Sequence, residues 1–414
     1  MLQRYIKFLI PCITKYQKNE KIRSIPADVA FLCKSRIFAS DMRNAFFLLL
    51  LGALSLPAAA QRPDRNLFAW EYDADFQLIF DNREFAYSQD AVIPSGTLNV
   101  LVFAPTAGFS VQQSPRIHHR LTAGVELAHD FGSQTWRDLP REALLFYDAH
   151  VQARKGVFEG VAGIFPRRFL EGAYTEAFFS GYFRNTDRNL EGLLLKWRSA
   201  RMYAELGCDW MGQYGYDRRE RFQVISSGSW SATDWLSLGW TGSFYHYACS
   251  ELAPNVVDNH LLEPWLKADF SRRTSWEELS LRAGALVGYQ RDRVRSSRAD
   301  VPFGGDLMLT ARRWGLTLQN ETYLGKSLTP LIAETDPAGV PYGAGLYFCS
   351  PAYDGFYDRL EFAWTPRLNR YMTMKLSARA HFGREGFLGW QQQFYLRFSL
   401  DALRHRAVVS GRCL

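Results

Sequence analysis

The feature that most constrains the fold is a period-two alternation of apolar and polar residues, repeated in segments of about ten residues along much of the chain. Between Met372 and Phe382 every second residue is apolar, and the residues between them include Lys375, Arg379 and His381. Successive side chains of a β-strand point to opposite faces, so this segment predicts a strand with one apolar and one charged face. Such a strand cannot lie in a wholly apolar core.

The same pattern predicts about sixteen strands. We place them at residues 72–81, 97–111, 117–130, 142–154, 157–166, 189–199, 201–212, 220–231, 235–247, 261–272, 276–290, 304–314, 316–326, 358–367, 372–383 and 390–400. Connections after the even-numbered strands are short, and most of the others are long. The sequence therefore predicts an all-β fold, a transmembrane antiparallel up-and-down β-barrel of about 14 to 18 strands. The strands of a soluble β-sandwich also alternate between apolar and polar residues, but the interior of a sandwich must be apolar, and the charged faces found here do not fit it.

A secretory signal peptide is predicted at residues 42–60. A cationic Arg43 precedes an apolar core from Ala45 to Leu56, and three alanines follow at 58–60. These are the three parts of such a signal. The core is shorter than the roughly 20 apolar residues that a membrane-spanning helix needs. We therefore expect export, with cleavage before residue 61.

The rest of the chain is divided around this signal. We interpret residues 1–41 as an upstream extension that results from a mis-assigned start codon, because they precede a plausible initiator methionine. The expected order after cleavage is a short periplasmic N-terminus at 61–71, the outer-membrane barrel at 72–400 and a C-terminal tail at 401–414. The short N-terminus has no room for a separate plug domain, which argues against an energy-coupled transporter.

Charge and cysteine content exclude two classes of function. The net charge is +7, but residues 1–60 hold nine Lys or Arg and three Asp or Glu, so the remainder carries only +1. We therefore predict no nucleic-acid partner. The six cysteines are scattered without CxxC pairs, so we predict no metal and no cofactor. Cys249 and Cys349 fall in loops expected on one side of the membrane, and a disulfide between them remains open.

The last predicted strand carries a recognisable signal. Phe394, Leu396 and Phe398 alternate with polar residues, and Gly389 lies upstream. This strand resembles the aromatic-alternating final strand of Gram-negative outer-membrane barrels of the porin type. The resemblance implies an outer-membrane location, outer-membrane lipid as surroundings, and recognition of these four residues by the barrel-assembly machinery. It covers residues 70–400 as a general pattern, and the tail after residue 400 departs from it.

A barrel of about sixteen strands is too wide for its own side chains to fill, so we expect a water-filled lumen. Charged residues on the non-lipid faces are the candidates for its lining. They are Lys196, Arg198, Arg201, Glu205, Asp209, Lys267, Arg282, Arg312, Lys375, Arg379 and Arg397. Such charges favour polar solutes over apolar ones. The alternative is that they only neutralise one another.

The long connection after the fifth predicted strand is the candidate constriction. Its charged residues are Arg167, Arg168, Glu171, Glu176, Arg184 and Arg188. Phe178 and Phe179 lie among them beside Tyr174, and a wholly exposed loop has little reason to carry them. In porins, which this plan resembles, the corresponding loop narrows the pore. We therefore expect this segment to enter or cap the barrel with a cationic side; the alternative is a surface loop packed on itself.

Three functions remain open. The first is a porin-like channel for the passive passage of small hydrophilic solutes, without a chemical step. The second is a plugged barrel that serves as a scaffold or export partner for surface polysaccharide or lipid. The third is an outer-membrane hydrolase with an outward Ser and His. His129 faces outward near an outer rim and Asp130 is beside it, but no outward Ser at matching depth is evident. The oligomeric state and the solute are not predicted.

Overall fold

The computed structural model describes residues 68–85, 95–132, 141–216, 218–252, 256–294, 296–328 and 354–400. The predicted upstream extension, signal peptide and C-terminal tail lie outside these residues, as does most of the predicted periplasmic N-terminus. Cys249 is disulfide-bonded, whereas Cys349, the partner that the sequence analysis left open, also lies outside the described part.

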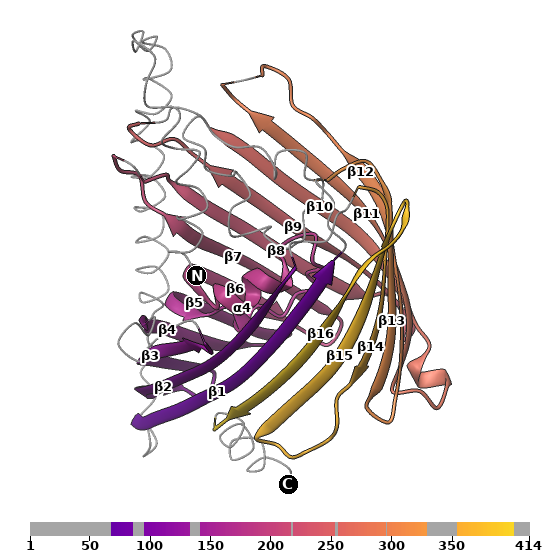
Figure 1. Cartoon of the computed structure of the whole chain (residues 1–414). Coiled ribbons are helices and arrows are strands. Elements are labelled where there is room, and N and C mark those ends of the chain that lie inside the picture. The colour runs from indigo at the N-terminus through magenta and orange to yellow at the C-terminus, as the bar shows by residue number, and fades with distance from the viewer. Residues whose placement is uncertain are drawn as a thin grey trace.

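The described residues form sixteen β-strands in one closed sheet (Figure 1). The first eight are β1 Phe68–Phe85, β2 Gly96–Ser114, β3 Ile117–Asp130, β4 Arg141–Ala153, β5 Gly156–Pro166, β6 Asn189–Arg198, β7 Met202–Gly212 and β8 Arg221–Ser231. The others are β9 Leu236–Tyr247, β10 Val257–Asp269, β11 Glu278–Asp292, β12 Phe303–Arg313, β13 Leu316–Gly325, β14 Gly355–Trp364, β15 Met372–Gly383 and β16 Gly386–Ser399. Each strand pairs antiparallel with its neighbours in sequence, and β16 pairs with β1 to close the barrel. The predicted fold class and strand number are confirmed.

The connections separate the two ends of the barrel. We call one the short-turn end; its connections are residues 115–116, 154–155, 199–201, 232–235, 270–277, 314–315 and 365–371. The opposite end, the loop end, carries most of the longer connections. One of its connections breaks the pattern, because β15 and β16 are joined by only Arg384 and Glu385. In outer-membrane barrels the short turns face the periplasm.

The start of β10 differs from the sequence prediction. We placed it at residue 261, but β10 begins at Val257, and Asp258 pairs with His246 on β9 and Arg291 on β11. The reason is that Asp258, Asn259 and His260 are three consecutive polar residues, which show no alternation. The strand continues because its backbone remains hydrogen-bonded on both sides, although its outward side chains have become polar.

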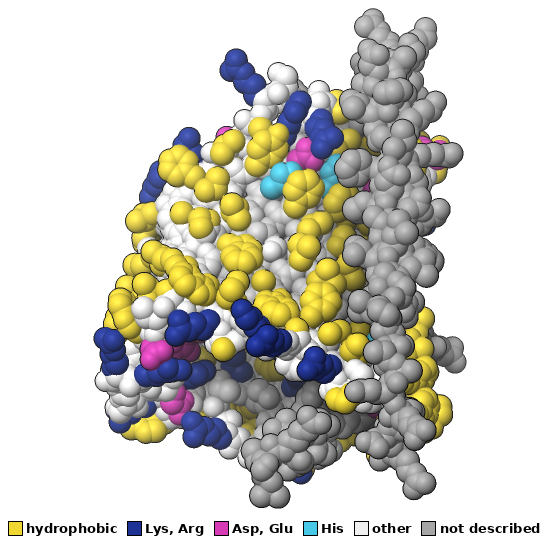
Figure 2. Space-filling view, turned by 180° about the vertical axis from the view of Figure 1, so that it is seen from behind, with side chains coloured by type: hydrophobic (Ala, Val, Ile, Leu, Met, Phe, Trp, Pro, Cys, Tyr) yellow, Lys and Arg dark blue, Asp and Glu magenta, His cyan; other side chains and the backbone are white. Residues whose placement is uncertain are grey.

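The outer face of the barrel is a broad apolar surface. Figure 2 shows it from behind, with yellow apolar side chains across the middle and blue Lys and Arg above and below. Exposed apolar residues on it include Leu262, Leu307, Leu318 and Phe362. No helix in the described part of the chain is long and apolar enough to cross a membrane. The alternation therefore separates an apolar outside from a charged inside, as predicted.

The seam between β1 and β16 yields a first prediction. A Cβ added at Gly389 would lie 2.4 Å from the backbone oxygen of Glu84 and 2.7 Å from the Cα of Phe85. We expect Gly389→Ala to force the two backbones apart and to destabilise the folded barrel by about 1–3 kcal/mol. The measurement is the urea midpoint of the refolded protein. The matched control is Gly96→Ala, because nothing lies within 4 Å of that Cβ; equal midpoints for both variants would contradict the prediction.

Candidate functional site: the inner loop and the lumen

The connection between β5 and β6, which we call the inner loop (residues 167–188), runs inside the barrel. It begins with a short 3-10 turn, η2 (Arg167–Phe169), and ends with one helix, α4 (Gly181–Thr186). Ser180 caps α4 by accepting a hydrogen bond from the N–H of Phe183 at 3.0 Å. Figure 1 shows α4 enclosed by the strands. The sequence predicted that this loop enters or caps the barrel, and the loop does lie inside it. That the loop narrows a pore stays a prediction.

Apolar side chains of the inner loop pack against the barrel wall. Ala177, Phe178, Phe179 and Phe183 are all buried. They belong to one cluster with the wall residues Tyr245, Tyr247, Val257, Leu261, Leu286, Tyr323 and Tyr357. These wall residues lie in the loop-end halves of β9 to β14. This cluster, which we call the aromatic cluster, therefore fills the lumen beside these strands toward the loop end.

The backbone of the inner loop is tied to the wall as well. The carboxylate of Glu205 on β7 accepts hydrogen bonds from the N–H groups of Glu171 and Gly172 at 2.9 and 2.8 Å. Ser227 on β8 accepts one from the N–H of Ala173 at 3.2 Å. Glu205 was predicted to line the lumen. Its carboxylate provides hydrogen-bond partners for N–H groups of the inner loop, which have no partners in the sheet.

The four arginines of the inner loop do not form one free cationic surface. Three of them pair with wall carboxylates at 2.7 Å; these pairs are Arg167 with Asp209, Arg168 with Asp75 and Arg188 with Glu126. Burial alone would lower the pKa of Arg167, but Asp209 and Asp187 raise it above its ordinary value. The fourth, Arg184, lies over the ring of Phe179 at 4.6 Å and donates a hydrogen bond to the carbonyl of Tyr174 at 2.7 Å.

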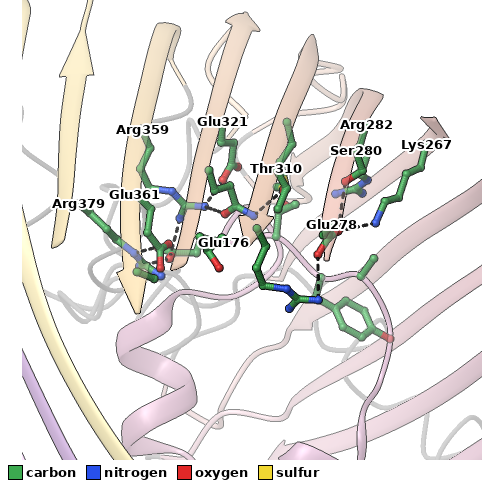
Figure 3. Close-up of a pocket in the computed structure, with 18 of the residues that line it drawn as sticks. Glu176, Lys267, Glu278, Ser280, Arg282, Thr310, Glu321, Arg359, Glu361 and Arg379 are labelled. Carbon is green, nitrogen blue, oxygen red and sulfur yellow. Dashed lines mark hydrogen bonds and ion pairs between the residues drawn. The ribbon is translucent and has the colours of Figure 1, made fainter. Parts of the chain in front are cut away.

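The two acidic candidates of the inner loop also meet basic wall residues. Glu171 pairs with Lys196 at 3.0 Å and with Arg198. Glu176 lies between two guanidinium groups, 2.9 Å from Arg359 on β14 and 2.8 Å from Arg379 on β15 (Figure 3). Burial alone would raise the pKa of Glu176, but Arg379 and Arg359 outweigh it and hold this pKa at about 2.

The predicted lumen residues on the strands are arranged in cross-strand ion pairs. Lys196 lies 2.8 Å from Glu159, Arg282 lies 2.6 Å from Glu263 and Arg397 lies 2.8 Å from Asp75. The further pairs are Lys267 with Glu278, Arg312 with Glu277 and Glu278, Lys375 with Glu361, and Arg379 with Glu361. Arg201 differs, because it precedes β7 and is exposed in the turn at the short-turn end. It therefore lies outside the strand in which it was predicted.

A cavity of about 500 Å³ lies between the inner loop and the barrel wall (Figure 3). Its wall comes from β10 to β15, and its roof includes Tyr174, Glu176 and Arg184 of the inner loop. The lining has seven basic residues, namely Arg184, Lys267, Arg282, Arg312, Arg359, Lys375 and Arg379. Its four acidic residues are Glu176, Glu278, Glu321 and Glu361. The lining is therefore net positive.

A second cavity, of about 330 Å³, lies on the other side of the inner loop. It is bounded by Gln77 on β1, Glu126 on β3 and Tyr395 on β16, together with the four inner-loop arginines. Tyr174 and Arg184 line both cavities. Because the aromatic cluster occupies the lumen beside β9 to β14, these two side chains mark the boundary between the two spaces.

Two important lumen residues were missed from the sequence. Arg359 forms ion pairs with Glu176 and Glu321. Asp75 forms ion pairs with Arg168 and Arg397. Both lie inside predicted strands, so the alternation contained the signal. Arg359 is two residues from Glu361 and hence on the same face. Among the described residues, no group of three or more His, Cys, Asp or Glu side chains is placed to hold a metal ion.

The remaining predicted residues lie at the seam. Phe394, Leu396 and Phe398 are paired with Phe80, Leu78 and Phe76 of β1. Their alternation with Gln393, Tyr395 and Arg397 puts them on the outer face, because Arg397 reaches Asp75 inside. The strand with the predicted assembly signal is therefore the strand that closes the barrel.

No protein-family model and no curated protein sequence matches the chain. The structure is similar to those of Gram-negative outer-membrane porins. A loop-deletion form of OmpT, an outer membrane protein of Vibrio cholerae, has a TM-score of 0.48 and 9% identity, over 81% of this chain and 100% of that one. OmpF of Salmonella typhi, solved in complex with daunomycin, has a TM-score of 0.45 and 8% identity, over 80% and 97%. A triple mutant of the Rhodopseudomonas blastica porin has 0.41 and 9%, over 80% and 100%. The likeness is one of fold.

The ion pairs of Glu176 with Arg359 and Arg379, which we call the tether of the inner loop, yield a prediction about pH dependence. Its pKa in the folded protein, about 2, lies below the ordinary value of 4.5. The carboxylate therefore stabilises the inner loop above about pH 4.5, and this contribution is lost as the pH falls toward 2. We expect hydrogen exchange of residues 171–188, corrected for intrinsic rates, to be constant between pH 7 and 5 and to accelerate below pH 4. Glu176→Gln should accelerate it at least about tenfold at pH 7. Equal protection of wild type and variant at pH 7 would refute the tether.

Proposed function

We propose that the chain forms an outer-membrane channel through which small hydrophilic solutes pass passively. The observation that carries this proposal is the pair of charged cavities on the two sides of the inner loop, which share Tyr174 and Arg184. A solute would pass beside these two side chains, because the aromatic cluster blocks the lumen next to β9 to β14. The proposal includes no chemical step and no cofactor.

The charges of the lumen support a preference for anions within this proposal. Seven basic and four acidic side chains line the larger cavity. Most of these charges are paired, so the field is weaker than the number of arginines would suggest. Arg184 is the basic residue that lines both cavities, and it keeps its charge at any relevant pH. We therefore place the selective position at Arg184 rather than at all four inner-loop arginines.

Location and assembly belong to the same proposal. The porin-like fold supports an outer-membrane location. We propose that the predicted signal peptide directs export and that the assembly machinery recognises Gly389, Phe394, Leu396 and Phe398. Placement of these residues on the closing strand supports this role, because recognition of a strand edge precedes its pairing with β1.

Reversal potentials in planar bilayers test the selectivity. Replacement of Arg184 by Gln removes one positive charge from the boundary between the two cavities, so the reversal potential in a salt gradient should shift toward cation preference. The shift should be clear at 0.1 M salt and small at 1 M, where the screening length falls to about 3 Å. The matched control is Arg291→Gln, which removes a charge from the outer face. An unchanged potential at 0.1 M for Arg184→Gln would contradict the assignment.

A plugged barrel is the second candidate, and one observation favours it. The inner loop is attached to opposite walls of the barrel. On one side Glu205 on β7 accepts hydrogen bonds from the N–H groups of Glu171 and Gly172. On the other side Glu176 pairs with Arg379 on β15, and Tyr182 lies 4.8 Å from the guanidinium of Arg83 on β1. A loop held on both sides can act as a permanent stopper. The barrel would then serve as a scaffold or export partner for surface polysaccharide or lipid.

Single-channel recording separates the two candidates. For a channel we expect discrete conductance steps from the wild-type protein, and for a stopper we expect steps only after the loop is released. The releasing variant is Glu176→Gln combined with Arg83→Gln. The control is Lys155→Gln at the short-turn end, away from the inner loop. Absence of steps from wild type, together with their appearance in the double variant, would overturn the channel proposal.

A further inference from the structure

The outer face of β8 to β11 carries a groove that the proposed channel does not use. Its volume is about 520 Å³. The lining residues are Val224, Ser226, Gly242, Ser243, Phe244, His260, Leu261, Leu262, Val287, Gly288, Tyr289 and Val301. Exposed fractions of 44% for Phe244, 51% for Leu262 and 39% for Val287 show that these apolar side chains face outward. The groove therefore opens toward lipid.

The strand register explains why the groove exists. Ser226, Gly242, Leu262 and Val287 form one outward row across the four strands. The two smallest residues of the row leave a gap in the apolar surface beside Leu262. A Cβ added at Gly242 would have no atom nearer than 3.6 Å, so the gap is open space rather than a tightly packed backbone contact.

An aromatic shelf closes the groove toward the loop end. The next outward row contains Phe244, His260 and Tyr289. The ring of His260 is stacked 3.7 Å from that of Phe244 and 5.5 Å from that of Tyr289. Flat rings at this position offer apolar area with a polar edge, which is typical of the boundary between hydrocarbon and headgroups.

Charged side chains lie directly beyond the shelf. The following row contains His246, Asp258 and Arg291. Arg293 forms a two-pronged pair with Asp258 at 2.7 and 3.0 Å, and His246 lies 3.1 Å from the same carboxylate. Arg291 hydrogen-bonds through Nε to the carbonyl of Ser296 at 3.3 Å, and no carboxylate among the described residues forms an ion pair with it. The rim is therefore net positive, and Figure 2 shows His and acidic side chains beneath Lys and Arg at the upper edge of the apolar face.

We infer that this groove binds one acyl chain of a phosphorylated glycolipid of the outer leaflet, lipid A, whose phosphate contacts Arg291 and Arg293. The acyl chain occupies the gap at Gly242 and Ser226, and its carbonyl end, which is linked to the sugar, lies over the shelf of Phe244, His260 and Tyr289. Charge complementarity selects an anionic headgroup, because guanidinium groups bind phosphate through paired hydrogen bonds. Position selects the leaflet, because the charged rim lies at the loop end, which is the outer side of such barrels.

This inference is independent of the channel proposal, since the groove and the lumen lie on opposite faces of the same strands. Binding here alters neither cavity and needs no movement of the inner loop. An anchored lipid would instead fix the tilt and depth of β8 to β11 in the outer leaflet. Single-channel conductance therefore serves as a readout that a folded groove variant should leave unchanged.

Native mass spectrometry of the full chain in detergent tests the inference, with lipid A, phosphatidylglycerol and phosphatidylcholine as separate probes. We expect wild type to retain one lipid A at a concentration at least about tenfold lower than phosphatidylcholine. Gly242→Leu fills the gap and should weaken retention of lipid A by about tenfold or more. The reason is that displacing even two methylene groups of the acyl chain from the groove costs about this much binding free energy. Arg291→Gln should weaken it by a similar factor through the lost charged hydrogen bonds.

Matched variants separate the groove from general effects on folding. Gly305→Leu adds the same side chain at another outward glycine, where the nearest atom is 4.0 Å from the added Cβ. Arg272→Gln removes a charge that is 77% exposed at the short-turn end. Both should retain lipid A like wild type. Equal retention by Gly242→Leu and wild type would overturn the groove. Equal retention of phosphatidylglycerol and lipid A would overturn the assignment to a glycolipid.

Discussion

The structure depends on one constraint, which is that a backbone N–H or C=O in the hydrocarbon layer must find its hydrogen-bond partner within the protein. A sheet meets this requirement only when its last strand pairs with its first, as β16 does with β1 from Asp75 opposite Ser399 to Phe85 opposite Gly389. Closure with sixteen strands then fixes the width of the barrel. The wide interior, in turn, must hold water or a segment of the chain itself.

Two kinds of interaction fill that interior at different depths. Toward the loop end, Phe178, Phe179 and Phe183 of the inner loop pack against tyrosines of the wall. Toward the short-turn end, Glu176 binds Arg359 and Arg379 above a charged cavity. Aromatic packing fills one part of the lumen, while the ion-paired part keeps a cavity of about 500 Å³. The inner loop thus divides the lumen into two cavities, and Tyr174 and Arg184 line both of them.

The same strands present a different surface to lipid. Because side chains alternate across the sheet, Ser243 and Tyr245 face inward while Gly242 and Phe244 face outward. A gap in the outer row consequently has no effect on the lumen. The two faces of β8 to β11 can therefore serve different purposes, a solute path inside and a lipid contact outside.

The sequence by itself determined the strands, their number, the two faces of each strand and the unusual aromatic content of the inner loop. Each of these follows from local periodicity or from residue types next to one another in the chain. Where the alternation ceases, at Asp258 to His260, the prediction missed the start of β10. Only the tertiary structure decided which charges meet. Glu176 and Arg359 are 183 residues apart, and their contact depends on closure, on register and on the path of the inner loop. The groove at Gly242 likewise required the register of four strands, because a small residue creates a gap only when its cross-strand neighbours leave it open.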